Sequence, residues 1–345
     1  MSSLSAIMAL KIQGRHYADN IGRCDILFDS FRYFGLRSLF SEWLIVIPGA
    51  EQEAITRYAR AWQDFPIRFV VEDEYLEVFK RFSKLHQVRN WHRQQIIKLM
   101  CAELVQNEFF MVLDPDIFAV KAAHAGDLIV NGRAIVEADR REWHAEWWRD
   151  SADLLGVDPG LELPGMGVTP AILSRDACRG LTRYIEDRHQ RSWHEVLLSR
   201  YATQWTEYTL YNLYLEHTRQ FDRYHVTPAA AGLKQRLHSP APWGVWKSGD
   251  YEKLDVAGLF SADNPGLFSV VQSNVGVTPQ CIAADFAPFV PLRVQDYERA
   301  SVSLLERGRE FYGAALRRGL RLFQERGRRV APELAPSPEP RRPLR

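Results

Sequence analysis

The chain has 345 residues, of which 46% are hydrophobic and 25% are charged, a composition typical of a globular protein with a full core. Its formal net charge of +1 excludes nucleic-acid binding that depends on an overall positive charge. The cysteines lie far apart without CxxC spacing, and no run of about 18 apolar residues is present. We therefore expect neither a disulfide framework nor a membrane-spanning helix, and a cytoplasmic location is predicted.

The first third of the chain alternates between segments with the period of a strand and segments with the period of a helix. The expected strands are 4–10, 42–49, 66–73 and 109–113, and the expected helices are 24–35, 51–62 and 87–106. Strands that alternate with helices of this length predict right-handed βαβ units. We therefore expect an α/β fold, with a mixed, mainly parallel, Rossmann-like sheet flanked by helices.

The second part of the chain has a different pattern. Residues 127–137 predict a hairpin, because Asn131-Gly132 suits a type I′ turn. Helices are expected over 141–156, in a segment that opens at Thr169-Pro170, over 192–202 with Ser192 and Glu195 at capping-box spacing, and over 206–218 with Thr206 as N-cap. Loops and short strands are expected over 219–290.

The last part of the chain is basic and rich in proline. An arginine-rich helix is expected over 291–330, and a disordered tail over 331–345. Two interpretations of the helix stay open at this stage. It can pack on the domain by one face, or it can associate with an anionic membrane at its inner face, because leucines alternate with the arginines.

Two aspartates follow the apolar run FFMVL, in the stretch FFMVLDPDIFAVK over 109–121. An unpaired buried carboxylate is costly, so Asp114 and Asp116 need a partner. In open α/β sheets, ligands bind outside the carboxyl ends of the strands, and carboxylate oxygens suit Mg²⁺ or Mn²⁺. The stretch therefore predicts a cation site, and a turn that merely ends the strand is the alternative.

The expected helix before this strand carries WHRQQIIKL over 91–99. Gln94 and Lys98 are four residues apart and share a face of the helix. Lys98 can meet a diphosphate there, and the amides of Gln94 and Gln95 can contact a base or a ribose. Arg93 is a further candidate for binding the donor. A solvated polar face is the alternative interpretation.

These blocks resemble nucleotide-sugar glycosyltransferases of the GT-A fold, and in particular a bacterial group with a W-x-RQQ-x-x-KL helix ahead of a strand that ends in LDxD. The stretches MGVTPAILSR, WTEYTLYNLYL and FSVVQSN are similar to further blocks of that group, so the resemblance covers most of residues 5–285. It implies a catalytic domain over 1–290. Residues 1–125 would be the nucleotide-sugar half and 126–290 the acceptor half.

The resemblance also implies roles for individual residues. Asp116 would hold a Mn²⁺ or Mg²⁺ ion, and Asp114 would be a second ligand or a ribose contact. His225 and His238 are candidates for a histidine that completes the metal site, and we favour His238. Glu207, in the first turn of its helix, would activate or orient the acceptor, although an acid there also suits the helix dipole.

The function predicted from this pattern is a metal-dependent transfer of sugar from a nucleotide-sugar donor to a polysaccharide, a glycolipid or another envelope acceptor. A nucleotidyltransferase acting on sugar phosphates is one alternative, although KIQGRHYADNIG after the first strand contains no convincing phosphate loop. A catalytically inert domain that binds sugars or a partner is the other alternative.

Overall fold

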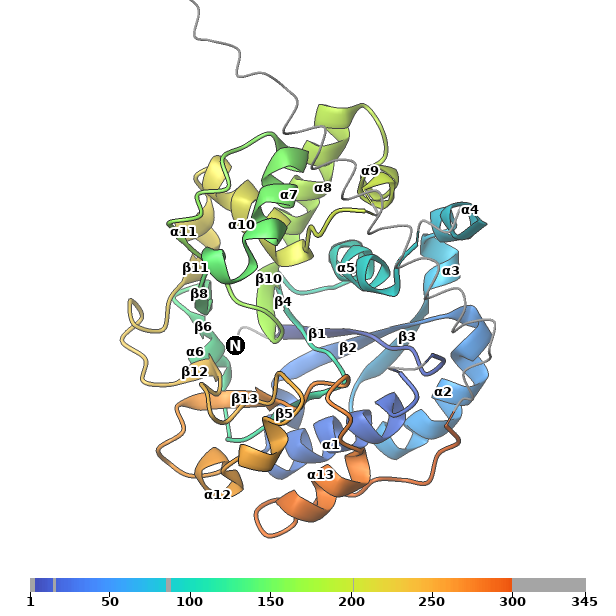
Figure 1. The fold of residues 1–345 in the computed structure, drawn as a ribbon, viewed down its shortest axis with the longest axis vertical. Coiled ribbons are helices and arrows are strands. Elements are labelled where there is room, and N and C mark those ends of the chain that lie inside the picture. Colours follow the sequence, from blue (N-terminus) through green and yellow to red (C-terminus); the bar gives the residue numbers. More distant parts are fainter. Residues whose placement is uncertain (1–3, 15–16, 85–87, 201, 300–345) are drawn as a thin grey trace, which may run out of the picture. The chain divides into compact units, whose positions relative to one another are not determined.

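A five-stranded sheet forms the centre of the described structure, in the order β10-β4-β1-β2-β3 (Figure 1). The computed structural model describes residues 4–14, 17–84, 88–200 and 202–299. The strands are β1 (Leu4–Ala9), β2 (Phe40–Ile47), β3 (Ile67–Val71), β4 (Phe109–Val112) and β10 (Ala171–Ser174). All neighbours pair in parallel except β10, which is antiparallel to β4. The predicted α/β fold with a mixed, mainly parallel sheet flanked by helices is confirmed.

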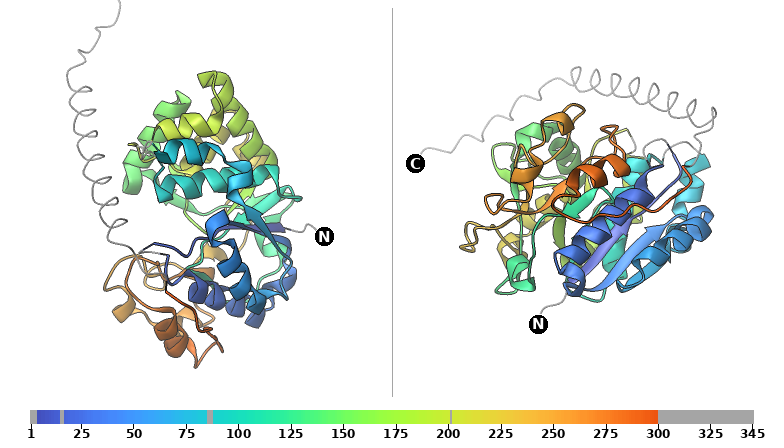
Figure 2. Two further views of the ribbon diagram at one scale, coloured as in Figure 1. Left: turned by 90° about the vertical axis from the view of Figure 1, so that its right-hand side faces the viewer. Right: turned by 90° about the horizontal axis from the view of Figure 1, so that it is seen from below.

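Helices cover both faces of this sheet (Figures 1 and 2). On one face lie α1 (Asn20–Tyr33), α2 (Gln52–Tyr58) and α13 (Pro279–Phe286), and on the other lie α5 (Asn90–Met100), α7 (Ala145–Leu155), α8 (Arg175–His189), α9 (Trp193–Ser199) and α10 (Glu207–His217). Phe28 of α1 packs its ring 4.9 Å from the ring of Trp43 in β2 and 4.9 Å from that of Trp62. Buried aromatic rings in this arrangement stabilise the layer through large apolar contact areas.

The two predicted halves of the chain share their sheets. Strand β5 (Ile117–Ala119) pairs with β13 (Gly266–Val270), which also pairs with β12 (Arg236–His238). The smaller strands are β6 (Ile129–Val130), β7 (Arg133–Ile135), β8 (Ala138–Arg140), β9 (Pro164–Met166) and β11 (His225–Val226), and the shorter helices are α3 (Glu72–Tyr75), α4 (Val78–Lys84), α6 (Ala125–Leu128), α11 (Phe221–Tyr224) and α12 (Val256–Leu259).

Local chemistry explains several of these elements. The hairpin between β6 and β7 turns at Asn131 and Gly132, whose φ angles of 52° and 74° fit the predicted type I′ turn. Helix α10 is capped by Thr206, whose side chain accepts a hydrogen bond from the Thr209 amide, as predicted. At Ser192, by contrast, the predicted capping box is wrong: the serine makes no side-chain cap, and Glu195 instead binds Arg81 at 2.6 Å.

The segment that opens at Thr169-Pro170 was expected to be helical, but it enters β10 instead. Residues Ala171–Ser174 are all buried and pair with β4, so the apolar side chains fill the sheet edge rather than one face of a helix. The helix α8 begins only afterwards, with Ser174 as its N-cap. Tertiary pairing here overrides the local pattern.

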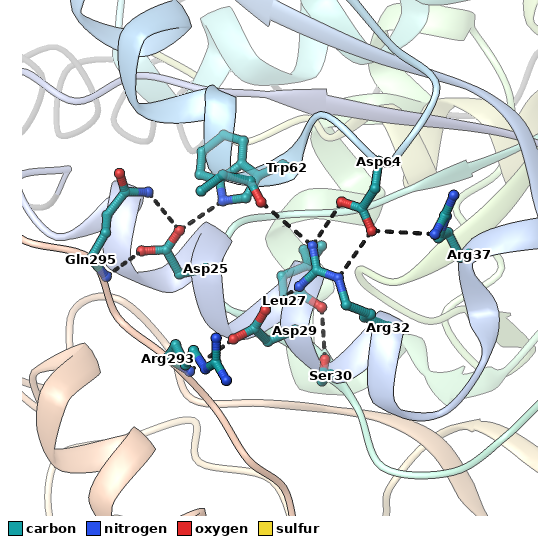
Figure 3. A network of polar contacts seen from close by, with 11 residues as sticks. Asp25, Leu27, Asp29, Ser30, Arg32, Arg37, Trp62, Asp64, Arg293 and Gln295 are labelled. Carbon is teal, nitrogen blue, oxygen red and sulfur yellow. Dashed lines mark hydrogen bonds and ion pairs between the residues drawn. The ribbon is translucent and has the colours of Figure 1, made fainter.

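The predicted basic helix does not begin at residue 291, since residues 291–299 form neither helix nor strand. Asp25 of α1 accepts hydrogen bonds from the backbone and side chain of Gln295, and Asp29 accepts one from the Arg293 amide (Figure 3). These bonds hold the segment along α1 in place of helical bonds of its own. The rest of the predicted helix and the tail lie outside the described residues.

Candidate functional site

The carboxyl ends of β1, β2, β3 and β4 meet at one edge of the parallel sheet, and the candidate site is built there. Strand β4 ends at Val112, and Asp114 and Asp116 follow it. The Ile117 amide donates to the Asp114 carbonyl at 3.1 Å, so the chain turns sharply at Pro115 before β5 begins. The strand break predicted from the sequence is therefore present, and both carboxyl groups lie at the turn.

A buried ionic cluster surrounds Lys98 of α5. Its Nζ lies 3.3 Å from Asp114 Oδ1 and 3.1 Å from Glu207 Oε1, and it donates a hydrogen bond to the Thr169 hydroxyl at 3.3 Å. Thr169 in turn shares a 2.7 Å hydrogen bond with Tyr208. The side-chain exposures are 4% for Lys98, 0% for Glu207 and 26% for Asp114, so only the aspartate has substantial access to solvent.

The electrostatics of this cluster follow from its burial. Burial alone would lower the pKa of Lys98, but the charges of Asp114 and Glu207 raise it well above its usual value. Burial raises the pKa of Glu207, and the charge of Lys98 opposes that shift. Lys98 is therefore held as a cation between the two carboxylates.

Asp116 lies in a second environment. Its Oδ2 accepts a hydrogen bond from the Ser273 amide at 2.9 Å, in the loop after β13. The positive charge that acts on it is that of Arg23 in α1, whose guanidinium donates to the carbonyl oxygens of Val271 and Val277. Burial raises the pKa of Asp116, the charge of Asp114 raises it further, and the charge of Arg23 lowers it. A cation between the two aspartates would relieve this repulsion.

A small polar cleft opens at the ends of β1 and β2. Arg93, Gln94 and Asn90 line it from α5, and Glu72, the residue directly after β3, lines it as well. Its remaining lining residues are Ala9, Leu10, Lys11, Tyr17, Val46 and Ile97. Arg93 Nε donates to Glu72 Oε1 at 3.0 Å, and burial raises the pKa of Glu72 against the charge of Arg93.

The structure divides the predicted donor-binding residues into groups. It places Arg93 and Gln94 in the cleft, and it places Lys98 with Asp114 in the buried cluster. Gln95 is buried on α5 and is not among the residues that line the cleft. Gln95 follows Gln94 directly, so its side chain points to another face of the helix, as the 3.6-residue period requires.

The predicted metal-ligand set is not gathered. Within the described ranges, no group of three or more His, Cys, Asp and Glu side chains is placed to hold a metal ion. His238 lies instead in a second, closed hollow with Glu137, Gly167 and Pro170, where burial lowers its pKa. His225 is buried and bonded to the Tyr211 hydroxyl at 2.8 Å.

Two aspartates without a third protein ligand still fit a cation that takes its other ligands from phosphate and water. Asp114 and Asp116 offer the hard oxygen atoms that Mg²⁺ and Mn²⁺ prefer. Lys98 donates its hydrogen bond to Asp114 Oδ2, so Oδ1, although close to the Lys98 charge, accepts no hydrogen bond from the described part of the chain and keeps its lone pairs for a cation. A Mg²⁺ ion is commonly bound in this way, through one or two carboxylates plus substrate phosphates.

Sequence reasoning missed several residues of the site. Glu72 follows a strand directly, as Asp114 nearly does, so the same positional signal was present in VVED. Thr169 could be found only once β10 was known to pair with β4. Arg23 carries no signal, because the Val271 carbonyl that it binds lies 248 positions further along the chain.

The fold and site together define an α/β protein with a polar cleft and an acidic turn at the carboxyl edge of its sheet. The chain belongs to the family of unknown function DUF6492, whose model matches residues 1–294. No curated protein matches the chain significantly.

Two solved structures are distantly similar. One is the apo form of mouse xyloside xylosyltransferase 1, at 13% identity and a TM-score of 0.46, over 80% of this chain and 100% of that one. The other is galactosyltransferase LgtC in complex with donor and acceptor sugar analogues, at 11% identity and a TM-score of 0.43, over 89% and 100%. At this distance the functional argument depends on the side chains of the site. In the described part of the chain, no helix has both the length and the apolar character needed to span a bilayer.

Proposed function

We propose that the protein is a glycosyltransferase that uses a nucleotide-sugar donor. One observation carries this proposal: the acidic pair Asp114 and Asp116 lies at the same sheet edge as the cleft lined by Arg93 and Gln94. The cleft offers hydrogen-bonding groups for a nucleoside, and the aspartates offer oxygen ligands for a cation bound to its diphosphate. Ligands of open α/β sheets bind in this region.

Asp116 and Asp114 would hold the divalent ion, Mn²⁺ or Mg²⁺. When bound, such an ion supplies Lewis-acid stabilisation of the negative charge on a departing diphosphate. The Ser273 amide fixes one oxygen of Asp116, and Lys98 fixes the carboxylate of Asp114. The residues of the chain therefore pre-organise both carboxylates before the donor arrives, which lowers the reorganisation needed at the transition state.

The geometry favours a different role for Glu207 and Lys98 from the one predicted. A general base must reach the proton that it removes, but Glu207 is fully buried and its nearest charged partner is Lys98. Lys98 is almost as buried, and its ammonium group is occupied by Asp114, Glu207 and Thr169. We therefore infer that Glu207 positions Lys98, and that Lys98 positions Asp114, without contact to acceptor or diphosphate.

The second hollow marks the side of the site on which we propose that the acceptor approaches. It is lined by Val168 and Pro170, the neighbours of Thr169 in the buried cluster, and by Gly167 and His238. The register of β10 against β4 brings this segment alongside the end of β4. A saccharide acceptor, from a polysaccharide or a glycolipid, would approach the acidic turn along this segment.

The test is a screen of nucleotide sugars with the full chain in Mn²⁺ or Mg²⁺, in which mass spectrometry follows slow donor hydrolysis without acceptor. We expect one donor to be hydrolysed, and Asp116→Asn to slow that reaction by roughly 10²–10³-fold, as for loss of one pre-organised charge. Asp187→Asn, a matched change on the exposed face of α8, should leave the rate unchanged.

Each other outcome contradicts the proposal in a recognisable way. Release of pyrophosphate from a nucleoside triphosphate and a sugar phosphate would identify a nucleotidyltransferase. If a nucleotide sugar bound but was not turned over under any condition or with any acceptor, the protein would be an inert binding domain. Equal rates for Asp116→Asn and the parent protein would remove the acidic turn from the mechanism.

A further inference from the structure

Arg23, near the start of α1, holds both ends of the loop that follows β13. Its Nη1 donates a hydrogen bond to the Val271 carbonyl at 2.7 Å, and its Nη2 donates one to the Val277 carbonyl at 2.9 Å. We call residues 271–277, which lie between and include these two carbonyls, the clasp loop. A guanidinium carries its donors in a rigid planar fork, so one arginine can hold two acceptors in fixed positions.

The clasp loop is also the segment that contacts Asp116. The Ser273 amide donates a hydrogen bond to Asp116 Oδ2 at 2.9 Å, while Asn274 and Gly276, further along the loop, are exposed to solvent. An exposed loop opens easily unless it is held at defined points. Arg23 holds the two ends of this loop, so it also determines where the Ser273 amide lies and how the Asp116 carboxylate is oriented.

The position of Arg23 is costly for stability. The residue is 3% exposed, and its Nε is buried without a hydrogen bond among the described residues. Burial of a charge, and burial of a donor without an acceptor, both cost free energy. A role in positioning the clasp loop therefore explains this arginine better than a contribution to stability does.

We propose that Arg23 is a positioning residue for the cation site. It holds the clasp loop, the Ser273 amide of that loop orients Asp116, and the oriented carboxylate binds the divalent ion. Arg23 itself contacts neither the ion nor the donor. This inference rests on the proposed function, because it takes Asp116 as a ligand of the cation.

The charge of Arg23 and its hold on the clasp loop affect a cation in opposite directions. The charge acts on Asp116, whose pKa it lowers. A positive charge close to a cation site repels the cation, so by its charge alone Arg23 weakens metal binding. By its hold on the clasp loop it strengthens metal binding. Substitution of Arg23 therefore separates the two effects by their sign.

Titration of the full chain with Mn²⁺, followed by the electron paramagnetic resonance signal of the free ion, measures metal affinity without turnover. We expect Arg23→Gln and Arg23→Lys each to weaken Mn²⁺ binding by roughly 10–100-fold, as for other groups that orient metal ligands. The lysine variant is decisive, because it keeps the charge but its single ammonium group cannot replace the fork.

Arg32→Gln is the matched control. It removes an exposed arginine from the same helix, nine residues and therefore roughly 13 Å further along the helix axis. We expect this variant to bind Mn²⁺ as tightly as the parent protein does. A general effect of removing a positive charge from α1 would instead appear in Arg32→Gln as well.

A variant in the loop tests the same contact from the other side. Ser273→Pro removes the amide hydrogen that Asp116 accepts and leaves Arg23 in place, so it remains informative if the Arg23 variants do not fold. We expect a loss of affinity similar to that of Arg23→Lys. The double variant should lose no more than the larger of the two single losses, because both changes break one chain of contacts.

The remaining outcomes contradict either this inference or the proposed function. Unchanged affinity in Arg23→Lys and Ser273→Pro, or tighter binding in Arg23→Gln, would overturn this inference and leave the proposed function intact. Losses that add in the double variant would do the same, since Arg23 would then act independently of the loop. If the parent protein bound no Mn²⁺, with or without UDP, GDP, CDP or ADP, the proposed role of the acidic turn would fail, and this inference with it.

Discussion

Two polar regions lie at the same edge of the sheet, and they differ in how their charged groups are paired. In the cleft, Arg93 and Glu72 bind each other but leave Glu72 Oε2 without a hydrogen bond among the described residues. In the buried cluster, Lys98 is paired with both Glu207 and Asp114, and little of its side chain reaches solvent. The cleft therefore pairs its charges at a surface that a ligand can reach. The cluster pairs its charges in the interior, where neither oxygen of Glu207 has a hydrogen bond among the described residues.

This difference separates side chains that can recognise a ligand from side chains that hold Asp114 in position. Groups that face a cleft can exchange partners with a ligand at little cost, whereas a buried ion pair holds its members in one geometry and is costly to break. Substitutions in the cleft should therefore change binding more than stability. Substitutions in the cluster should change stability first and activity through the placement of Asp114.

The largest effect is expected from Lys98→Met. The change removes the only cation that directly pairs with Glu207 in the described structure, and so it leaves a buried carboxylate without a partner. Breaking a buried ion pair from one side typically costs about 3–5 kcal/mol. We expect a loss of this size in the free energy of unfolding, measured by urea denaturation at pH 7.

A double variant gives the control. Lys98→Met combined with Glu207→Leu removes both buried charges, so it should recover much of the lost stability, because well-packed apolar replacements of buried pairs are often neutral. Equal losses in the single and double variants would show that packing around α5, rather than charge, sets the stability of this region.

The pattern of the sequence was sufficient for most of the central sheet, because buried parallel strands appear as short apolar runs such as those of β2 and β4. It also located Asp114 and Asp116, since a strand end is a local feature. It failed for β10, whose four residues become a strand only by pairing with β4. It also failed to show that Glu207 would be fully buried, because burial depends on neighbours such as Lys98, 109 positions away, that only the folded chain assembles.

A second prediction concerns pH, because burial raises the pKa of Glu207. In the unfolded chain this carboxyl titrates near its usual value of about 4.3. The native state therefore keeps the proton at pH values where the unfolded state has lost it. The stability that Glu207 contributes is complete below about pH 4.3 and is lost as the pH rises through the raised folded value.

The comparison protein is Glu207→Gln, which cannot titrate at this position. The free energy of unfolding of the parent protein, minus that of the variant, should fall as the pH rises through this window. Each unit of difference between the two pKa values corresponds to about 1.4 kcal/mol. Urea denaturation of both proteins from about pH 4 to pH 8 measures it. A constant difference would show that folding does not shift the pKa of Glu207, and a difference that increases with pH would show that the charge of Lys98 lowers it.

The smallest effect is expected from two neighbouring glutamines on α5, and it tests the division most directly. Gln94 lines the cleft, whereas Gln95 is 5% exposed and does not line it. Gln94→Ala should weaken binding of the nucleoside diphosphate by roughly 2–10-fold, the value of one neutral hydrogen bond, with little change in stability. Gln95→Ala should leave binding unchanged and lower the free energy of unfolding, because it truncates a buried side chain.

Calorimetric titration gives the affinity of each variant for the nucleoside diphosphate, and urea denaturation gives its free energy of unfolding. If the two substitutions changed binding equally, the cleft would not be the place where the nucleotide is read.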